Sequence, residues 1–291
     1  MTLITRLSTA FTDNSLPILR RDSAITNGTI FLWEPKSLFC YPSQDPVIEE
    51  AQWTSMKNIA FEEYKTSTGS DWPAFTNGHG LWTASSNHLY YDSVSASVSG
   101  DPDGTDNRNS GPAFGSSADM FPDPSHSYLM SFWVKYTSSP TAFDGGNHQR
   151  LLDAGNSSFY PSGTIKSFAL TNSFSLEKVS TNGTQPMSSG ALSNKPINAV
   201  NQFGFAWAVV DGTWKYKAVN NNVVTNSGDW QNDIAGSATD GIITDSSAWV
   251  ELHPQSVTKF YRIMVEDLTV STRTPEQAWA ADWARGNGRF S

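Results

Sequence analysis

The feature that most constrains the fold is the alternation of apolar side chains along three well-separated segments. These segments are Tyr128–Tyr136, Gln202–Val210 and Lys259–Thr269. A period of two is the period of a β-strand, whose successive side chains point to opposite faces of a sheet. In the first two segments the wholly or largely apolar side comprises Tyr128, Met130, Phe132, Val134, Tyr136, Phe203, Phe205, Trp207 and Val209. We expect the three segments to lie in two facing sheets that share one apolar interior.

Shorter strand signals surround these segments, and turn residues separate them. Asp211-Gly212 lies between two alternating runs and is the strongest hairpin signal in the chain. Residues 47–64 are ambiguous between helix and strand spacing, and we favour a loop with short strands there. The other predicted strands are Thr29–Trp33, Gly80–Trp82, Asn87–Tyr91, Arg150–Asp153, Ser167–Leu170, Phe174–Val179, Thr213–Val219 and Val223–Thr225. Many short strands without βαβ alternation predict an all-β, antiparallel two-sheet sandwich.

The C-terminal region has a different pattern, which predicts a short helix over residues 275–285. Thr274 is placed to cap it, Pro275 suits the first helical position, and Gln277 completes a capping box. Trp279 and Trp283 are four residues apart and therefore share one helix face. We expect this pair to dock the helix on the sandwich.

The domain organisation predicted from these patterns is an extended arm over residues 1–29 and one sandwich over residues 30–291. Pro17 biases its neighbour toward extended backbone, and the arm is too polar to form a core of its own. We expect the arm to dock on a neighbouring subunit. The residues expected to make that contact are Leu16, Pro17, Ile18, Leu19, Arg20 and Arg21.

Charge and cysteine content restrict the partners. The net charge is -9, which disfavours nucleic acid and anionic membrane surfaces as partners. The single cysteine, Cys40, lies in an apolar run and is interpreted as a small buried side chain. The start of the chain lacks the apolar core of a signal peptide, and no window resembles a membrane helix, so we expect synthesis in a cytoplasm.

Several of these segments together resemble the concanavalin A-like (laminin G-like) superfamily. The residues that carry the resemblance are Ser131–Lys135, Phe205–Trp207, Asp211-Gly212, Lys215–Asn221, Phe260–Ser271 and Thr274–Gln277. The resemblance spans about residues 75–285 and implies a jelly-roll sandwich. This fold hosts many functions, so it indicates function only weakly.

A narrower resemblance is to bacteriophage virion proteins that carry such a sandwich. Its residues are Leu16-Pro17, Arg21-Asp22, Gly28–Trp33 and the ending EDLTVSTRTPEQAWAADWA. It implies a structural or binding protein of the virion, tail- or baseplate-associated, made in the host cytoplasm and oligomeric in the particle. Its partners would be other virion proteins and host-surface glycans. The alternatives are a free carbohydrate-binding, lectin-like module and, third, a divergent glycoside hydrolase.

Catalytic motifs are absent from the sequence, so we expect no enzymatic activity. A retaining glycosidase needs two carboxyl groups about 5 Å apart. The adjacent pairs Glu49-Glu50, Glu62-Glu63 and Glu266-Asp267 point to opposite faces if extended. We also expect no cofactor, with Ca²⁺ as the one candidate ion.

The candidate calcium ligands lie in a loop rich in glycine, proline and aspartate. Asp101, Asp103 and Asp106 supply oxygen atoms at a spacing that Ca²⁺ accepts. The segment is not a twelve-residue EF-hand loop, and a solvated loop is the favoured alternative.

Carbohydrate contacts are expected from aromatic rings near polar loops. The candidate residues are Trp72, Trp82, Trp230, Asp144 and Asn147. A tryptophan buried in the core is the favoured alternative for each of the three indoles.

Overall fold

The fold is taken from a computed structural model of the chain. It describes residues 22–48, 50–77, 89–99, 112–123, 125–137, 149–154, 164–170, 174–180, 183–186, 198–210, 213–224, 231–232, 249–252 and 258–290. The strands are β1 (Thr29–Trp33), β2 (Val47–Ile48), β3 (Thr76–Asn77), β4 (Leu89–Asp92), β5 (Ser97–Ser99), β6 (Pro112–Ser116), β7 (Tyr128–Tyr136), β8 (Gln149–Ala154), β9 (Thr164–Leu170), β10 (Phe174–Ser180), β11 (Gly183–Pro186), β12 (Val200–Val210), β13 (Thr213–Asn220), β14 (Val223–Val224), β15 (Gln231–Asn232), β16 (Trp249–Leu252) and β17 (Thr258–Asp267). The helices are α1 (Glu50–Trp53), α2 (Phe61–Thr68), α3 (Ser117–Met120), α4 (Leu268–Ser271) and α5 (Pro275–Gly286).

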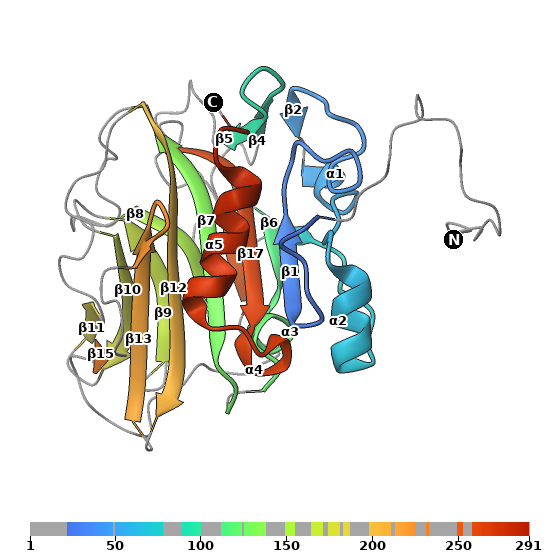
Figure 1. Cartoon of the computed structure of the whole chain (residues 1–291). Helices are drawn as coiled ribbons and strands as arrows, with labels where there is room; N and C mark the ends of the chain where they lie inside the picture. Colours follow the sequence, from blue (N-terminus) through green and yellow to red (C-terminus); the bar gives the residue numbers. More distant parts are fainter. Residues whose placement is uncertain are drawn as a thin grey trace, which may run out of the picture.

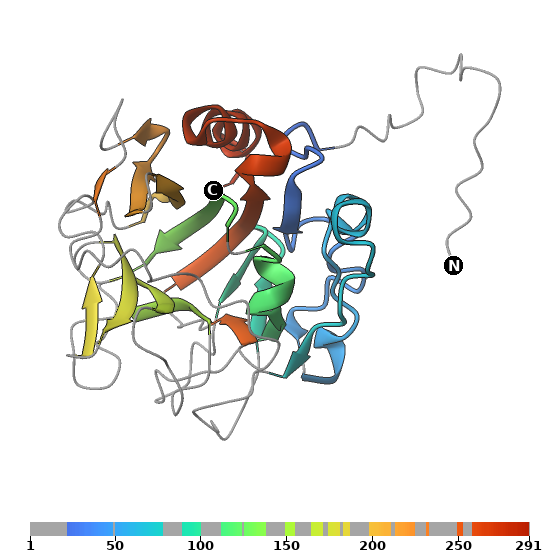
Figure 2. The ribbon, with the colours of Figure 1, turned by 90° about the horizontal axis from the view of Figure 1, so that it is seen from below.

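The strands form two antiparallel sheets that face each other (Figures 1 and 2). The larger sheet has the order β14-β13-β12-β7-β17-β5-β4-β2, with β1 on β17 and β15 on β13. The smaller sheet has the order β11-β10-β9-β8-β16-β6-β3. The prediction of an all-β, antiparallel jelly-roll sandwich with a short C-terminal helix is therefore confirmed. The expectation that the three alternating segments divide between two sheets is wrong, because β7, β12 and β17 are all in the larger sheet.

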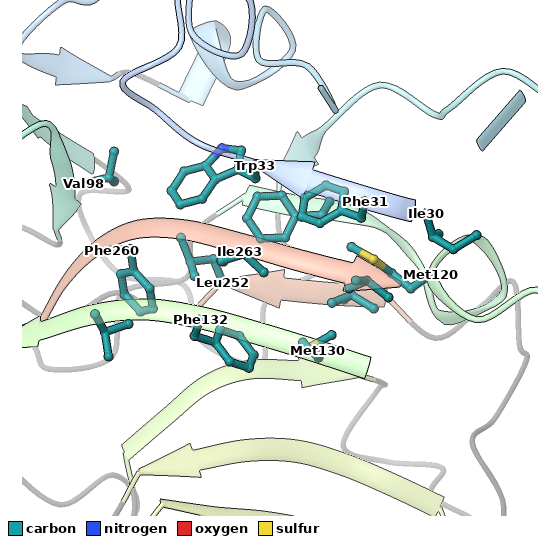
Figure 3. Packing of buried hydrophobic residues seen from close by; sticks show 14 of the residues in the cluster. Ile30, Phe31, Trp33, Val98, Met120, Met130, Phe132, Leu252, Phe260 and Ile263 are labelled. Atoms are coloured by element: carbon teal, nitrogen blue, oxygen red, sulfur yellow. The ribbon is translucent and has the colours of Figure 1, made fainter. Parts of the chain in front are cut away.

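The core lies between the sheets and contains the predicted apolar stripes. All five predicted side chains of β7 are buried in it, and so are Phe203, Phe205 and Trp207 of β12. From the opposite sheet, Phe114, Val250 and Leu252 complete the cluster. Figure 3 shows Phe132, Met130, Leu252 and Trp33 converging on this interior. Strand alternation alone therefore located the core-facing side of β7 and β12.

Strand β17 departs from simple alternation. Its pairing with β7 shifts register between Phe260 and Arg262, which marks a β-bulge or a similar irregularity. A one-residue shift moves every following side chain to the other face. As a result Phe260, Ile263 and Val265 all face the core, whereas Arg262 and Met264 face the outer side. The uninterrupted alternation expected over 259–269 is corrected at this point, and the strand ends at Asp267, where α4 begins.

The outer face of the larger sheet is covered by α5, which crosses β12, β7 and β17 in Figure 1. The predicted capping box is present, since the Thr274 side chain accepts from the Gln277 N–H and the Gln277 side chain bonds back. Trp279 is fully buried, and Trp283 stacks on Trp133 at 5.4 Å between ring centroids. The helix approaches β12 so closely that a Cβ on Gly204 would lie 2.6 Å from the Trp279 indole nitrogen. The predicted docking of the helix through its two tryptophans is confirmed.

A buried ionic cluster fastens α5 and the N-terminal segment to β17. The fully buried Arg262 guanidinium donates to Asp282 at 2.7 Å, to Glu34 at 2.7 Å and to Asp22 at 2.8 Å. Arg285 also donates to Asp22, and Arg289 to Glu34. These contacts join the N-terminal segment to β17, more than 200 residues later in the sequence, and β17 to α5. We name Arg262, Asp22, Glu34 and Asp282 the Arg262 cluster.

Residues 22–29 belong to the folded body, because Ala24 is buried and Thr26 donates to Glu266. The predicted division at residues 29 and 30 stays a prediction. The docking residues predicted over 16–21 lie outside the described residues.

Two short segments differ from the sequence-based expectation. Residues 47–64 contain the short strand β2 but also the helix α1 and the start of α2. Residues 112–116, which lie outside every predicted strand, form β6, and α3 follows it directly. Packing of α2 against β1, and pairing of β6 with β16 and β3, override weak local signals in these places. Among the described helices none is long and apolar enough to cross a membrane.

The hairpin between β13 and β14 closes through Asn221 and Asn222. Both have positive φ, 49° and 63°. Type I′ turns require positive φ at both central positions, and asparagine tolerates it well. Replacing the more common Asn-Gly by Asn-Asn therefore preserves the hairpin.

Candidate functional site

A groove of about 370 Å³ opens beside β1, between the segments that surround α1 and α2. We name it the Phe39–Trp72 groove. The lining residues used below are Phe39, Lys57, Asn58, Phe61, Asp71 and Trp72. They come from the loop after β1, the loop before α2, α2 itself and the segment after it. The groove therefore combines aromatic side chains with charged groups.

One buried amide shapes the floor of the groove. The Asn58 side chain accepts from the Leu32 and Ala60 N–H groups and donates to the Ile30 carbonyl, each at 2.9 Å. This amide thus makes hydrogen bonds to the β1 backbone that a neighbouring strand would otherwise make. The Lys57 N–H donates to the Cys40 carbonyl at 2.9 Å, which joins the two loops. Lys57 and Phe39 are held together by this link.

Trp72 is fixed in one orientation. Its indole N–H donates to the Phe114 carbonyl at 3.0 Å. Its ring packs edge-on to Tyr64 at 4.7 Å and lies 5.2 Å from Phe31. Burial, the main cause, and the nearby Asp119 carboxylate raise the pKa of Tyr64 to about 12, so this neighbour is a neutral phenol. Trp72 is only partly buried and presents the rest of its ring to the groove.

Phe39 is the most exposed aromatic surface of the groove. Its side chain is 43% exposed, and its ring stacks on Phe61 at 5.4 Å with an interplanar angle of 18°. The Lys57 ammonium lies 5.8 Å from the Phe39 ring centroid. Large apolar side chains are seldom left exposed together on a protein surface unless they bind something. The stacked pair therefore marks this groove as a candidate binding surface.

The two charges that line the groove differ in their surroundings. Asp71 accepts from Lys65 at 2.7 Å, in a pair that is mostly exposed. Lys57 contacts the Phe39 ring, and it has no carboxylate partner among the residues that the structure describes. In the groove, therefore, the Asp71 carboxylate is already paired, whereas the Lys57 ammonium is not paired with a carboxylate of the described residues.

A larger hollow of about 510 Å³ lies at the corner between α4 and α5. Its charged residues pair with protein groups, since Lys217 donates to Glu276 at 2.6 Å and Arg273 donates to the Ala24 carbonyl at 3.2 Å. Among the residues that the structure describes, no aromatic side chain lines it. The Phe39–Trp72 groove is therefore the stronger candidate, because ligand sites combine apolar surface with a few polar groups.

Of the predicted carbohydrate-binding residues, the structure describes Trp72 and places it in this groove. The others, Trp82, Trp230, Asp144 and Asn147, lie outside the described residues, as do Asp101, Asp103 and Asp106. Within the described ranges, no three or more His, Cys, Asp or Glu side chains gather as metal ligands would.

Sequence reasoning missed Phe39, Phe61 and Lys57 as site residues. Phe39 belongs to the apolar run Leu38–Tyr41, which was interpreted through its buried cysteine. A signal was present, since this run lies between Pro35 and Pro42 and outside every predicted strand. Apolar residues in such a loop cannot all enter a core, and Leu38 and Phe39 remain exposed.

No protein-family model matches the chain, and neither does any curated protein. Among solved structures, it is similar to the CBM40 of the Ruminococcus gnavus IT-sialidase bound to α2,3-sialyllactose, with 15% identity and a TM-score of 0.32 over 50% of this chain and 77% of that chain. It is also similar to the leech intramolecular trans-sialidase complexed with 2,7-anhydro-Neu5Ac, with 14% identity and a TM-score of 0.34 over 60% and 26% of the two chains. The VIP36 exoplasmic/lumenal domain in its Ca²⁺/Man3GlcNAc-bound form has 12% identity and a TM-score of 0.29 over 62% and 82%. The fold is a jelly-roll sandwich, which rests on the two antiparallel sheets of the chain itself.

Proposed function

We propose that this chain is a carbohydrate-binding, lectin-like module that binds a sugar ring in the Phe39–Trp72 groove. The observation that carries the proposal is the exposed Phe39 ring, stacked on Phe61 beside a Trp72 side chain that is fixed by its own hydrogen bond. Pyranose rings present flat faces of C–H groups to such rings and direct their hydroxyl groups outward. Lys57 and Asp71 stand at the rim, where they would contact those hydroxyl groups.

The groove is suited to binding because its parts are fixed before a ligand arrives. The Asn58 amide, the Lys57–Cys40 hydrogen bond and the Trp72–Phe114 hydrogen bond each hold one wall. A preorganised site loses less conformational entropy when its ligand binds. We propose binding without turnover, as the sequence led us to expect. The bacteriophage setting, virion partners and oligomeric state stay predictions from the sequence.

The test compares two neighbouring apolar residues. A glycan array would first identify saccharides bound by the intact chain, and calorimetry would then measure their affinity for Phe39→Ala and Leu38→Ala. Covering about 60 Å² of the ring is worth about 1.5 kcal/mol, so Phe39→Ala should weaken binding about tenfold. Leu38 is 69% exposed and outside the groove lining, so Leu38→Ala should bind as the parent does.

Equal affinities of the two variants and the parent would refute the groove as the site. Failure to bind any saccharide on the array would refute the proposed function. Release of new reducing ends from a bound oligosaccharide would contradict binding without turnover.

A further inference from the structure

We propose that the Phe39–Trp72 groove prefers acidic saccharides, those that carry a carboxylate or sulfate group, and that Lys57 recognises this group. The inference rests on the proposed function and names the substrate class of the same site. It begins from the two charges that face the groove. Asp71 is paired with Lys65. Lys57 lies over the Phe39 ring and is not paired with a carboxylate among the described residues.

Lys57 lies next to the ring on which a sugar would stack. Its ammonium nitrogen lies 5.8 Å from the Phe39 ring centroid. Atoms in van der Waals contact are about 3.5–4.0 Å apart, so a sugar stacked on this face of the ring requires the ammonium to move aside. The exposed lysine side chain can swing to the edge of the ring, where its ammonium would face substituents of the sugar. The backbone N–H of Lys57 donates to the Cys40 carbonyl, which keeps Lys57 beside Phe39.

The electrostatic argument favours an anion over a hydroxyl group at this point. The Lys57 ammonium attracts the full negative charge of a carboxylate or sulfate, whereas a hydroxyl group offers it only a dipole. The chain as a whole has a net charge of -9, so an anionic ligand gains nothing from long-range attraction. Preference for an acidic sugar must therefore come from local contact with Lys57, and a single substitution should remove it.

The experiment measures the ratio of affinities for matched acidic and neutral ligands. The probes are an oligogalacturonate, the neutral galactan of the same length, and a sulfated galactan. The intact chain should bind an acidic probe about tenfold more tightly than the neutral one, and this ratio should fall as salt is added. The two acidic probes distinguish a carboxylate from a sulfate as the preferred group.

Two lysine variants test the assignment. Lys57→Gln should bring the acidic-to-neutral ratio close to one and remove its dependence on salt. Lys36→Gln is the matched control, since Lys36 is exposed in the same loop region and does not line the groove, and it should keep the parent ratio.

An unchanged ratio in Lys57→Gln would overturn the inference. If Phe39→Ala still weakened saccharide binding about tenfold in that case, the proposed function would stand without the inference. Tighter binding of the neutral probe by the intact chain would overturn the inference in the same way, and no binding of any saccharide would overturn both proposals.

Discussion

Replacing Arg262 by methionine should destabilise the fold strongly, because the substitution leaves buried carboxylates without their shared cation. Arg262 is fully buried and donates to Asp282, Glu34 and Asp22 at 2.7–2.8 Å. Burial acts to lower the pKa of Arg262, but the charges of the three carboxylates outweigh it and raise the pKa. Removing one partner of a buried ion pair costs about 3–5 kcal/mol. We expect a loss of that size at neutral pH.

Arg285, which contacts Asp22 of the Arg262 cluster from a partly exposed position, supplies the control. Arg285 donates to Asp22 at 3.0 Å but is 32% exposed. Pairs open to water contribute about 0–1 kcal/mol, so Arg285→Met should lower stability by no more than about 1 kcal/mol. Urea unfolding of the parent and both variants measures the two free energies.

The pH dependence separates this explanation from a simple packing defect. Burial acts to raise the pKa of Asp22, but the charge and hydrogen bonds of Arg262 outweigh it and lower the pKa below 3.8. In the parent, Asp22 therefore adds stability that is present above pH 3.8 and is lost as the pH falls through its lower folded-state pKa. In Arg262→Met, carboxylates that face one another without the cation take up protons as the pH falls, so the deficit should shrink from pH 7 toward pH 4. A deficit below about 1 kcal/mol, or one of constant size across this range, would refute the reasoning.

Three further outcomes follow from the packing and burial of single residues. Gly204→Ala should cost about 1–3 kcal/mol in urea unfolding, because the new Cβ would lie 2.6 Å from the Trp279 indole nitrogen, and a loss within error would contradict that crowding. Burial raises the pKa of Glu266 above 4.5, so the folded state holds the proton of this carboxyl more tightly than the unfolded chain does, and stability should fall as the pH rises above 4.5. Glu266→Gln should flatten that part of the plot of stability against pH, and an unaltered plot would count against this explanation. Burial raises the pKa of Cys40 to about 12, so alkylation at pH 8 should proceed only as fast as the chain unfolds, and rapid labelling of the native protein would disprove its burial.

The strands and the terminal helix could be predicted because their signals are local. Alternation identified the buried side of β7, since every second side chain from Tyr128 to Tyr136 lies in the core. The Thr274 capping box fixed the start of α5 for the same reason, since cap and partner are three residues apart. Sequence spacing of two or three residues is enough to define either feature.

The bulge in β17 and the partners of Arg262 could not be predicted in this way. The register shift between Phe260 and Arg262 depends on pairing with β7, which is more than 120 residues earlier. In the sequence, Arg262 is a charged residue at an alternating position of a strand, which normally indicates a solvated face. It is buried because α5 folds over that face and brings Asp282 to it. Only the tertiary arrangement converts an apparently exposed position into the centre of an ionic cluster.

The difference between local signals and long-range contacts also explains why the candidate site was found through Trp72 and not through Phe39. Trp72 could be singled out because an indole beside polar residues is unusual wherever it lies. Phe39 gains its role from Phe61, 22 residues later in the sequence, and from the Asn58 amide that holds the intervening loop against β1. Loops placed by a rigid sheet are common positions for binding residues. Here the Asn58 and Trp72 hydrogen bonds tie irregular segments to strands, and the Lys57–Cys40 hydrogen bond joins two of the loops. The groove therefore inherits the rigidity of the sandwich although little of its lining comes from a strand.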